Sequence, residues 1–428
     1  MNFKLQKIFS VKNVNLRNGI LFSLFSFFNS GISFLIMLVM ARYILPASYG
    51  QLSLFTTMVS LLTIFICLNT NGFISISFFG SPRIRIQRLL NVVLLTTLLM
   101  YLFLLTSLFC FNSFFTKVVG LNVTFQFFAI SICTIQVLST SLLDVWRLEE
   151  KVWQYGTFSL LNAICNLLFT FCFVGIFSLD WLGRVYAQLV VCIVFSLLSI
   201  YILINKKYLR RVLPTKSDFK ESYKFGIPLI PHSTSFWLRQ GFDRYIINYY
   251  ISQSMVGLYS FATNISNVIQ IIGYAFNTSN SVSIYKILSG NENNKLAKLQ
   301  HECYFLVILY FILTILCFLG AVLFIPFIFP EYIDCIQYLF PLCISAMFQC
   351  FYLVYVNIIF FYKQTLKLMF LTVLVSLLHV SFSFVFTRYG VIYTAYISLV
   401  SNMLICIGVY WYSQKLLDQF IHLSLKDI

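Results

Sequence analysis

The chain has 428 residues, of which 60% are hydrophobic and only 10% are charged. A soluble domain is about 45–50% apolar and about 25% charged, so the composition excludes a soluble globular protein. The apolar runs are continuous rather than alternating, which excludes a transmembrane β-barrel. Because one membrane helix needs about 20 apolar residues, we predict an all-α integral membrane protein with about 12 transmembrane helices.

Twelve apolar segments follow one another, and breaks such as Pro46, Ser81-Pro82 and Pro330-Glu331 separate them. The predicted spans are 19–44, 49–79, 89–112, 123–146, 156–178, 182–204, 226–250, 255–285, 303–329, 333–361, 364–387 and 390–413. The first span is too long for a signal peptide, and no small-residue cleavage site follows it. We therefore expect it to remain as the first membrane helix.

Lys and Arg are distributed unequally between the predicted loops. With the N-terminus in the cytoplasm, most of the 29 basic residues fall in inner segments, and the outer loops hold only Arg42, Lys117, Arg184 and Arg388. This bias predicts that both termini are cytoplasmic. It also explains most of the net charge of +16, so we expect no nucleic-acid partner.

The two halves of the chain align at an offset of 207 residues, which places Gly50-x-x-Ser53 on Gly257-x-x-Ser260. Six helices per half give both halves the same orientation in the membrane. Transporters with such a parallel repeat hold their substrate path between the halves. We predict an N-terminal six-helix bundle at 1–204, a basic cytoplasmic linker at 205–225 and a C-terminal six-helix bundle at 226–428.

The seventh segment, 226–250, carries Arg239, Asp243 and Arg244. A charge in mid-membrane costs at least about 2.5–3.5 kcal/mol, so these side chains must face the bundle interior or a wet cavity. Two interpretations stay open. Arg239 and Asp243, four residues apart on one helix face, form a pair that joins helices, or Arg239 binds an anion while Asp243 tunes the site. Two Arg against one Asp favour the anion site, and Arg suits phosphate because its planar guanidinium donates bidentate hydrogen bonds.

Amide side chains line the helices that the repeat makes equivalent. Single amides usually join membrane helices, but the three-residue spacing of Asn264, Asn267 and Gln270 favours a cavity wall suited to sugar hydroxyls. The predicted substrate-binding residues are therefore Arg239, Arg244, Asn29, Asn71, Asn264, Asn267 and Gln270.

Other features carry less weight. Pro228 and Pro231 predict a bend near the inner end of the seventh segment, and His379 and Asn402 are interpreted as satisfied interior groups. No pair of the 12 Cys has metal-ligand spacing, so we predict no metal. H-E-x-x-H, G-x-S-x-G and Walker A signatures are absent. We therefore predict that the protein is not an enzyme and needs no cofactor beyond an ion gradient.

Several motifs carry a resemblance to a known family. They are A-R-Y-I-L-P-x-x-Y-G at 41–50, L-N-x-N-G at 68–72, F-G-I-P-L-I-P-H at 225–232, D-R-Y at 243–245 and V-G-L-Y-S at 256–260. In these motifs the chain resembles the O-antigen flippases, which are Wzx-type polysaccharide transporters. Their superfamily (multidrug/oligosaccharidyl-lipid/polysaccharide exporters) also holds the MATE exporters and the lipid II flippases. The resemblance implies a MATE-like fold of two six-helix bundles, with a central cavity and alternating access.

The resemblance also implies a function. Undecaprenyl-diphosphate-linked O-antigen or oligosaccharide repeat units would be flipped from the cytoplasmic to the periplasmic leaflet of the bacterial inner membrane, for lipopolysaccharide biosynthesis. Arg239 and Arg244 would bind the diphosphate, and Asp243 is the candidate proton-coupling residue. Helices one and two lack the mid-membrane Arg of lipid II flippases, which argues against lipid II as the substrate. The implied partners are the lipid-linked oligosaccharide, the bilayer, the O-antigen polymerase and the chain-length regulator.

Three alternatives stay open at this point. A MATE-like ion-coupled small-molecule exporter would favour buried carboxylates over arginines. A membrane O-antigen polymerase or ligase would carry a large periplasmic loop, whereas every outer loop predicted here is short. An inert scaffold of a membrane complex would give no reason for the costly charge of Arg239.

Overall fold

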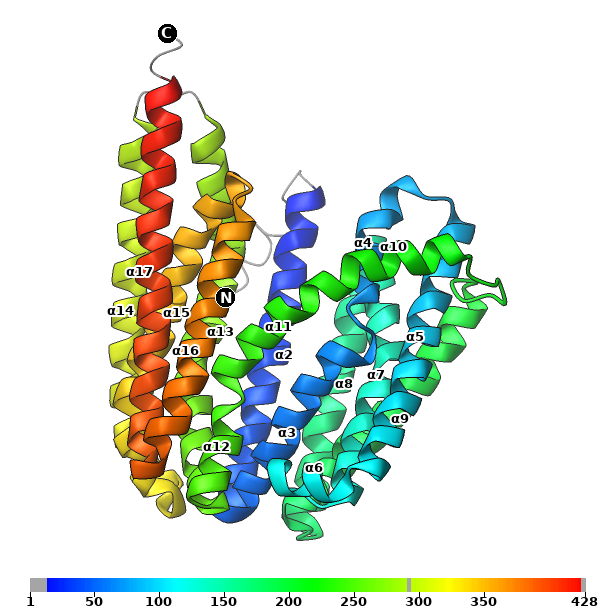
Figure 1. Ribbon diagram of the computed structural model, residues 1–428, viewed down its shortest axis with the longest axis vertical. Coiled ribbons are helices and arrows are strands. Elements are labelled where there is room, and N and C mark those ends of the chain that lie inside the picture. Colours follow the sequence, from blue (N-terminus) through cyan, green and yellow to red (C-terminus); the bar gives the residue numbers. More distant parts are fainter. Residues whose placement is uncertain (1–13, 291–293, 425–428) are drawn as a thin grey trace, which may run out of the picture. The chain divides into compact units, whose positions relative to one another are not determined.

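The computed structural model describes residues 14–290 and 294–424, and all regular structure within them is helical (Figure 1). The N-terminal basic residues Lys4, Lys7 and Lys12 lie outside the described residues. In chain order, the first half holds α2 (Val14–Tyr43), α3 (Pro46–Ile66), α4 (Thr70–Ser77), η1 (Phe78–Gly80), α5 (Arg83–Cys110), α6 (Asn112–Val119), α7 (Val123–Leu148), α8 (Val152–Thr170), η2 (Phe171–Ile176) and α9 (Asp180–Asn205). The second half holds α10 (Lys216–Gly226), η3 (Ile227–Leu229), α11 (Ile230–Gln240), α12 (Asp243–Tyr250), α13 (Gln253–Ser289), α14 (Lys295–Ile328), η4 (Pro330–Cys335), α15 (Ile336–Phe361), α16 (Thr365–Phe386), η5 (Thr387–Tyr389) and α17 (Val391–Ser424).

Eleven helices among the described residues are long and apolar enough to cross a membrane. They correspond to every predicted span except the seventh, although the helix expected at 49–79 already ends at Ile66 and is followed by the separate short helix α4. Large apolar side chains remain exposed along them, as lipid-facing helices require, and Phe103, Leu316 and Phe370 are each 60% exposed or more. The chain is therefore an all-α, multi-pass membrane protein, as the composition predicts.

The predicted seventh span, 226–250, is a succession of short helices rather than one continuous helix. Pro228 lies in the 3₁₀ turn η3, and Pro231 lies in the first turn of α11. Proline lacks the N–H that an α-helix needs, which accounts for the irregular start. A second interruption follows at Gly241, where α11 has ended and α12 has not yet begun.

The helices form two compact units. Unit 1 comprises Met1–Ile44 and Leu54–Thr234, and unit 2 comprises Leu45–Ser53 and Ser235–Ile428. Helices α3 and α11 each contribute residues to both units. The boundary at 204–226 that the sequence predicts between two bundles stays a prediction.

Part of the segment predicted as a linker is the helix α10, which packs against α4 and α5 within unit 1 (Figure 1). The side chain of Thr215 and that of Asp218 form a capping box at its N-terminus. Asp218 is 3% exposed and lies 3.0 Å from Arg88 Nε of α5. These contacts hold the connection between the two halves of the chain against unit 1.

Two of the family-like motifs pack against each other in unit 1. Leu68 and Asn69 have positive φ angles of 49° and 55°, which ends α3 and allows α4 to start in a new direction. A Cβ on Gly226 would lie 2.2 Å from the carbonyl oxygen of Leu68, and a Cβ on Gly72 would lie 3.0 Å from the ring of Phe225. The L-N-x-N-G and F-G-I-P motifs therefore meet where only glycine leaves enough space.

Equivalent residues of the predicted repeat meet within unit 2. A Cβ on Gly257 would lie 1.9 Å from the carbonyl oxygen of Pro46, and a Cβ on Gly50 would lie 2.0 Å from that of Gln253. Pro46 and Gln253 are themselves 207 residues apart, so each glycine receives the equivalent carbonyl of the other half. Such a reciprocal contact is what a two-fold axis produces, and it agrees with a parallel repeat.

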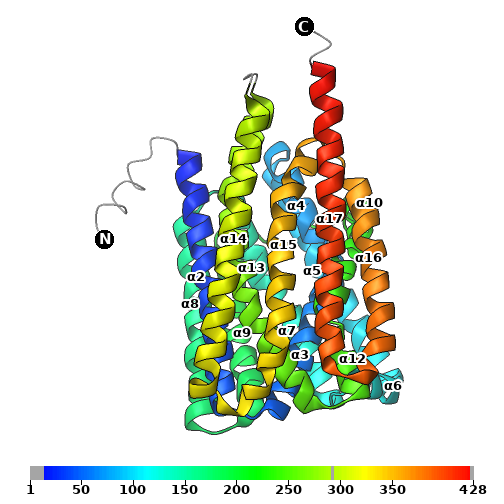
Figure 2. The ribbon, with the colours of Figure 1, turned by 90° about the vertical axis from the view of Figure 1, so that its left-hand side faces the viewer.

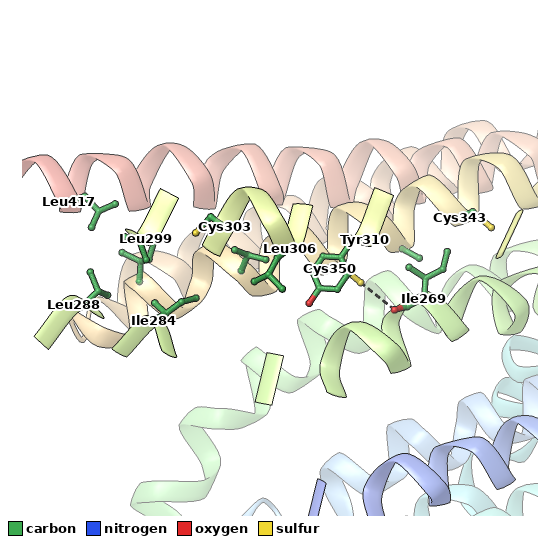
Figure 3. Close-up of a cluster of buried hydrophobic side chains, with 13 residues drawn as sticks. Ile269, Ile284, Leu288, Leu299, Cys303, Leu306, Tyr310, Cys343, Cys350 and Leu417 are labelled. Carbon is green, nitrogen blue, oxygen red and sulfur yellow. Dashed lines mark hydrogen bonds between the residues drawn. The ribbon is translucent and has the colours of Figure 1, made fainter. Parts of the chain in front are cut away.

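An apolar core joins α13, α14 and α15 in unit 2. Figure 3 shows part of it, with Ile269, Leu306, Tyr310 and Cys350 turned toward one another. Each of these side chains is at most 2% exposed, and Cys350 Sγ donates to the carbonyl oxygen of Ile269 at 3.5 Å. Figure 2 shows α14, α15 and α17 alongside one another. This packing fixes the helices that carry the polar residues described next.

Candidate functional site

The charged residues of the seventh segment lie on either side of a helix break. Arg239 is in the last turn of α11, and Asp243 is the first residue of α12. Gly241 donates its N–H to the carbonyl oxygen of Trp237 at 2.7 Å. Because the helix is interrupted between Arg239 and Asp243, their four-residue spacing does not place them as neighbours on one continuous helix. Each side chain instead reaches its own set of partners on other helices of unit 2.

Arg239 is buried among neutral partners. It is 9% exposed, its Nε donates to Ser376 Oγ of α16 at 3.0 Å, and its Nη1 donates to Asn402 Oδ1 of α17 at 3.0 Å. Its guanidinium also lies 5.6 Å from the centre of the Phe236 ring. None of these partners carries a negative charge, so they leave the positive charge of the guanidinium uncompensated.

Asp243 is buried in a set of hydrogen-bond donors. It is 1% exposed. One carboxylate oxygen lies 3.0 Å from His379 Nε2 and accepts from Ser383 Oγ at 2.9 Å. The other accepts from Ser398 Oγ and from Tyr259 OH, both at 3.2 Å. The carboxylate therefore contacts side chains of three other helices, α13, α16 and α17.

His379 links the carboxylate to a further helix. Its Nδ1 lies 3.0 Å from Ser401 Oγ of α17, and the side chain is 1% exposed. The imidazole of His379 on α16 therefore bridges the carboxylate of Asp243 on α12 and the hydroxyl of Ser401 on α17.

A chain of polar contacts connects the Arg239 site with the Asp243 site. Asn402 Nδ2 donates to Ser345 Oγ of α15 at 2.8 Å, and Ser345 Oγ donates to the carbonyl oxygen of Ser398 at 3.0 Å. Asn402 contacts Arg239 and Ser398 contacts Asp243. Hydrogen-bonded residues of α15 and α17 therefore connect the two charged residues.

Arg244 lies at the contact between repeat-equivalent residues. Its Nε donates to Ser260 Oγ at 3.0 Å, and its Nη1 donates to the carbonyl oxygen of Gln240 at 2.7 Å. Ser260 also receives a 2.6 Å hydrogen bond from Ser53, its equivalent 207 residues away. Arg244 thus joins α12 to the place where the two repeats meet.

The predicted amide stripe of α13 divides into different environments. Asn264 is 9% exposed and donates to Tyr49 OH at 2.9 Å, so it joins two helices. Asn267 and Gln270 are only partly buried on the same helix. Of these three residues, Asn264 has the contact expected of an interhelical amide.

The two remaining predicted residues belong to unit 1. Asn29 of α2 lines a polar cavity together with Arg184 and amides of α7, α8 and α9. Asn71 of α4 accepts a hydrogen bond from Cys67 at 3.5 Å. Of the predicted site residues, Asn29 and Asn71 therefore belong to unit 1, and the others belong to unit 2.

The sequence did not predict which side chains contact the charged residues. His379 and Asn402 were interpreted as interior groups, and the structure places both in the interior. It also shows that His379 contacts Asp243 and that Asn402 contacts Arg239. Hydroxyls seven residues apart on α16, Ser376 and Ser383, were not singled out. A spacing of seven residues places both hydroxyls on one helix face. This spacing was the feature of the sequence that could have identified them as partners of the charged residues.

The fold is that of transporters of the MOP superfamily. A multidrug resistance MATE family transporter of this superfamily, solved in an inward-facing conformation, matches with a TM-score of 0.77 at 16% sequence identity, over 91% of this chain and 95% of the other. A MOP superfamily transporter from Pyrococcus furiosus, described as having a binding pocket of reverse polarity, matches with a TM-score of 0.67 at 16% identity, over 93% and 95%.

Sequence comparisons define the family more narrowly. The family described as "Polysaccharide biosynthesis protein" matches residues 15–282, which is more than half of the chain, so the chain belongs to this family. Protein 1 of the Lsg locus of Haemophilus influenzae is 22% identical over 90% of this chain and 94% of its own length. A membrane protein of the same organism is 23% identical over 87% and 90%.

Proposed function

We propose that the protein carries undecaprenyl-diphosphate-linked oligosaccharide repeat units, such as those of O-antigen, from the cytoplasmic to the periplasmic leaflet of the bacterial inner membrane. Both termini lie in the cytoplasm in this proposal, in line with the bias of Lys and Arg toward inner loops. The fold of MOP transporters and the membership in a polysaccharide biosynthesis family support a transported sugar. Alternating access, with movement of one helix bundle against the other, moves the substrate.

The buried guanidinium of Arg239 is the observation that carries the proposal. A membrane-buried charge with only neutral partners is costly, and such charges in membrane proteins are retained for function. A diphosphate supplies the missing negative charge, and an Arg binds it through paired hydrogen bonds. Arg244 adds a second positive charge on the next helix, and the partly buried Asn267 and Gln270 suit the hydroxyls of the attached sugar.

Asp243 and His379 are the proposed proton-coupling pair. Both are about 1% exposed, and they lie in the same unit as Arg239. Net transport requires that the affinity for the substrate differ between the inward and outward states. A proton taken up by this pair changes the charge of the unit that holds the anion, which supplies such a difference.

A complementation experiment tests the transport function. A strain deleted for the gene receives the wild-type protein, Arg239→Ala, Arg239→Lys or the control Arg388→Ala, whose side chain is exposed and contacts Tyr389. Lipid-linked oligosaccharide is then measured on each face of the inner membrane. Hydrogen bonds to charged groups contribute about 1.5–3 kcal/mol, so Arg239→Ala should slow translocation by roughly tenfold or more at an unchanged protein level. Arg239→Lys should retain part of the activity, and Arg388→Ala should behave as wild type.

Two results would contradict the proposal. If the lipid-linked sugar still reaches the periplasmic face of the deletion strain and remains unpolymerised there, the protein is an enzyme of polymerisation rather than a transporter. Alternatively, Arg239→Ala at a normal protein level would translocate as fast as wild type, which would exclude Arg239 as the anion site.

A further inference from the structure

Unit 1 contains a polar cavity, and none of the residues of the proposed anion site in unit 2 lines it. Its volume is about 310 Å³, and α2, α7, α8 and α9 line it. The side chains that characterise it are amides and one guanidinium. They are Asn29, Gln136, Asn162, Asn166, Arg184 and Gln188. Among the described residues that line the cavity, none is a carboxylate, so its charge is positive.

Arg184 is held in place by neutral oxygens. Its Nη1 donates to Asn166 Oδ1 at 2.9 Å and to Thr170 Oγ1 at 3.2 Å. Asn166 in turn donates to Asn162 Oδ1 at 3.1 Å. The arrangement orders the amides of α8 beside the guanidinium and leaves the positive charge of Arg184 uncompensated.

A close helix contact fixes the position of Arg184. The preceding residue, Gly183, approaches the π-helical turn η2 so closely that a Cβ would lie 2.9 Å from Val174 Cγ2 and 3.0 Å from the backbone of Phe173. Turns of π-helix occur often at functional sites. The glycine lets α9 approach η2, and the next side chain, Arg184, enters the cavity.

Asn29 offers an acceptor that has no donor. Its Oδ1 is buried and has no hydrogen-bond partner in the structure, and Asn29 lines the same cavity. Buried polar atoms normally have a hydrogen-bond partner, so this oxygen is free to accept a hydrogen bond from a bound molecule. A hydroxyl group is such a donor, and the hydroxyls of Ser139 and Ser159 lie on the same lining.

We propose that this cavity binds a sugar residue that carries an anionic group. Arg184 binds the carboxylate of a uronic acid, and the amides bind the hydroxyls. Amides supply both donors and acceptors, which matches the alternating hydroxyls of a sugar, while the lack of a carboxylate disfavours a cationic drug. The binding site itself does not require the proposed function; only the identity of the sugar as part of a lipid-linked substrate rests on it.

Binding to the purified full-length protein tests the site directly. The probes are glucuronate, glucose and inorganic phosphate, titrated at millimolar concentrations against wild type, Arg184→Gln and the control Lys117→Gln. We expect glucuronate to bind more tightly than glucose or phosphate, and Arg184→Gln to weaken glucuronate at least tenfold while changing glucose less than twofold. Lys117→Gln should change neither. Should Arg184→Gln reduce the yield of folded protein, Gln188→Glu replaces it, because a carboxylate in the cavity repels the same anion.

The results that would overturn the site are equally specific. They are no saturable binding of glucuronate, equal affinity for phosphate and glucuronate, or unchanged glucuronate affinity in Arg184→Gln and Gln188→Glu.

Transport by reconstituted vesicles separates this inference from the proposed function. Vesicles hold undecaprenyl-diphosphate-linked saccharides that end either in a uronic acid or in a neutral hexose. Arg239→Ala should slow both substrates, since both carry the diphosphate, whereas Arg184→Gln should slow only the acidic one. If Arg184→Gln slows neither substrate while wild type carries both, the sugar site is wrong and the transport function stands. If wild type carries neither although glucuronate binds, the transport function is wrong and the sugar site stands.

Discussion

Replacement of Gly257 by alanine tests the reciprocal contact between the repeats. The new Cβ would lie 1.9 Å from the carbonyl oxygen of Pro46, whereas real Cβ atoms essentially never approach within 3.0 Å. The two helices must therefore separate by about 1 Å, and because the obstacle is backbone, no side chain can rotate away. Overpacking costs about 1–3 kcal/mol, and we expect the upper end of this range.

The matched control is Gly320→Ala in α14, where a Cβ would meet nothing within 4 Å. Both changes gain the same intrinsic helix preference of alanine, about 1 kcal/mol, so the difference between them isolates the overpacking. The entropy of unfolding is about 2.1 cal/mol/K per residue, which for 428 residues is about 0.9 kcal/mol/K. For a cost of about 3 kcal/mol we therefore expect Gly257→Ala to unfold roughly 3 °C below Gly320→Ala. The assay is thermal unfolding of the detergent-solubilised protein, followed by the loss of its monodisperse peak in size exclusion.

The symmetry of the contact adds a stricter requirement. Gly50→Ala should destabilise as much as Gly257→Ala, because its Cβ would lie 2.0 Å from the carbonyl oxygen of Gln253. The double variant should lose less than the sum of the two, since the first substitution already separates the helices. If Gly257→Ala melts together with Gly320→Ala, or if Gly50→Ala has no effect, the reciprocal contact is not present in the folded protein.

The other predictions concern the proton pair and the attachment of α10. Asp243→Asn, which keeps the shape of the side chain, should abolish proton-driven uptake in vesicles at a normal protein level; uptake that still follows the pH gradient would contradict the assigned role. His379→Gln should retain folding and lose the pH dependence of transport, and an unchanged pH profile would contradict this. Thr215→Ala removes the side-chain cap of α10 and should cost about 1 kcal/mol. Asp218→Ala should lose more stability, because it also leaves Arg88 without its 3.0 Å partner. The rate of tryptic cleavage in the preceding basic loop measures both effects and should rise more for Asp218→Ala. Equal cleavage of the two variants would contradict this order.

The long spans could be predicted because each depends on local composition alone. The span expected at 89–112 appears as α5, Arg83–Cys110, and that expected at 182–204 appears as α9, Asp180–Asn205. The expected span at 226–250 was wrong as a single helix, since Pro228, Pro231 and Gly241 interrupt it. The interruptions depend on the backbone hydrogen bonds at these particular residues. The number of apolar residues in the segment does not predict them.

The charged residues of the site could be predicted from the sequence, but the side chains that contact them could not. Arg239 and Asp243 are conspicuous in the sequence because charge is rare in a membrane helix. Their partners Ser376, Ser398 and His379 come from helices more than 130 residues away, and no spacing rule connects them. Arg184 was assigned to an outer loop because it lies near a predicted span end; in the structure α9 begins at Asp180, so Arg184 already lies within the helix.

The arrangement in unit 2 gives a physical reason for coupling a proton to an anion. In the proposed mechanism, a proton taken up by the pair of Asp243 and His379 removes one negative charge from the unit that holds Arg239 and Arg244. Anion binding at Arg239 must then strengthen when the pair gains a proton. Coupling between two sites is reciprocal, so a bound diphosphate must equally raise the affinity of the pair for a proton. Binding of the lipid-linked diphosphate should therefore be accompanied by proton uptake from a weakly buffered solution. That uptake should disappear in Asp243→Asn even where Asp243→Asn still binds the substrate, and binding without proton uptake in wild type would separate the two sites.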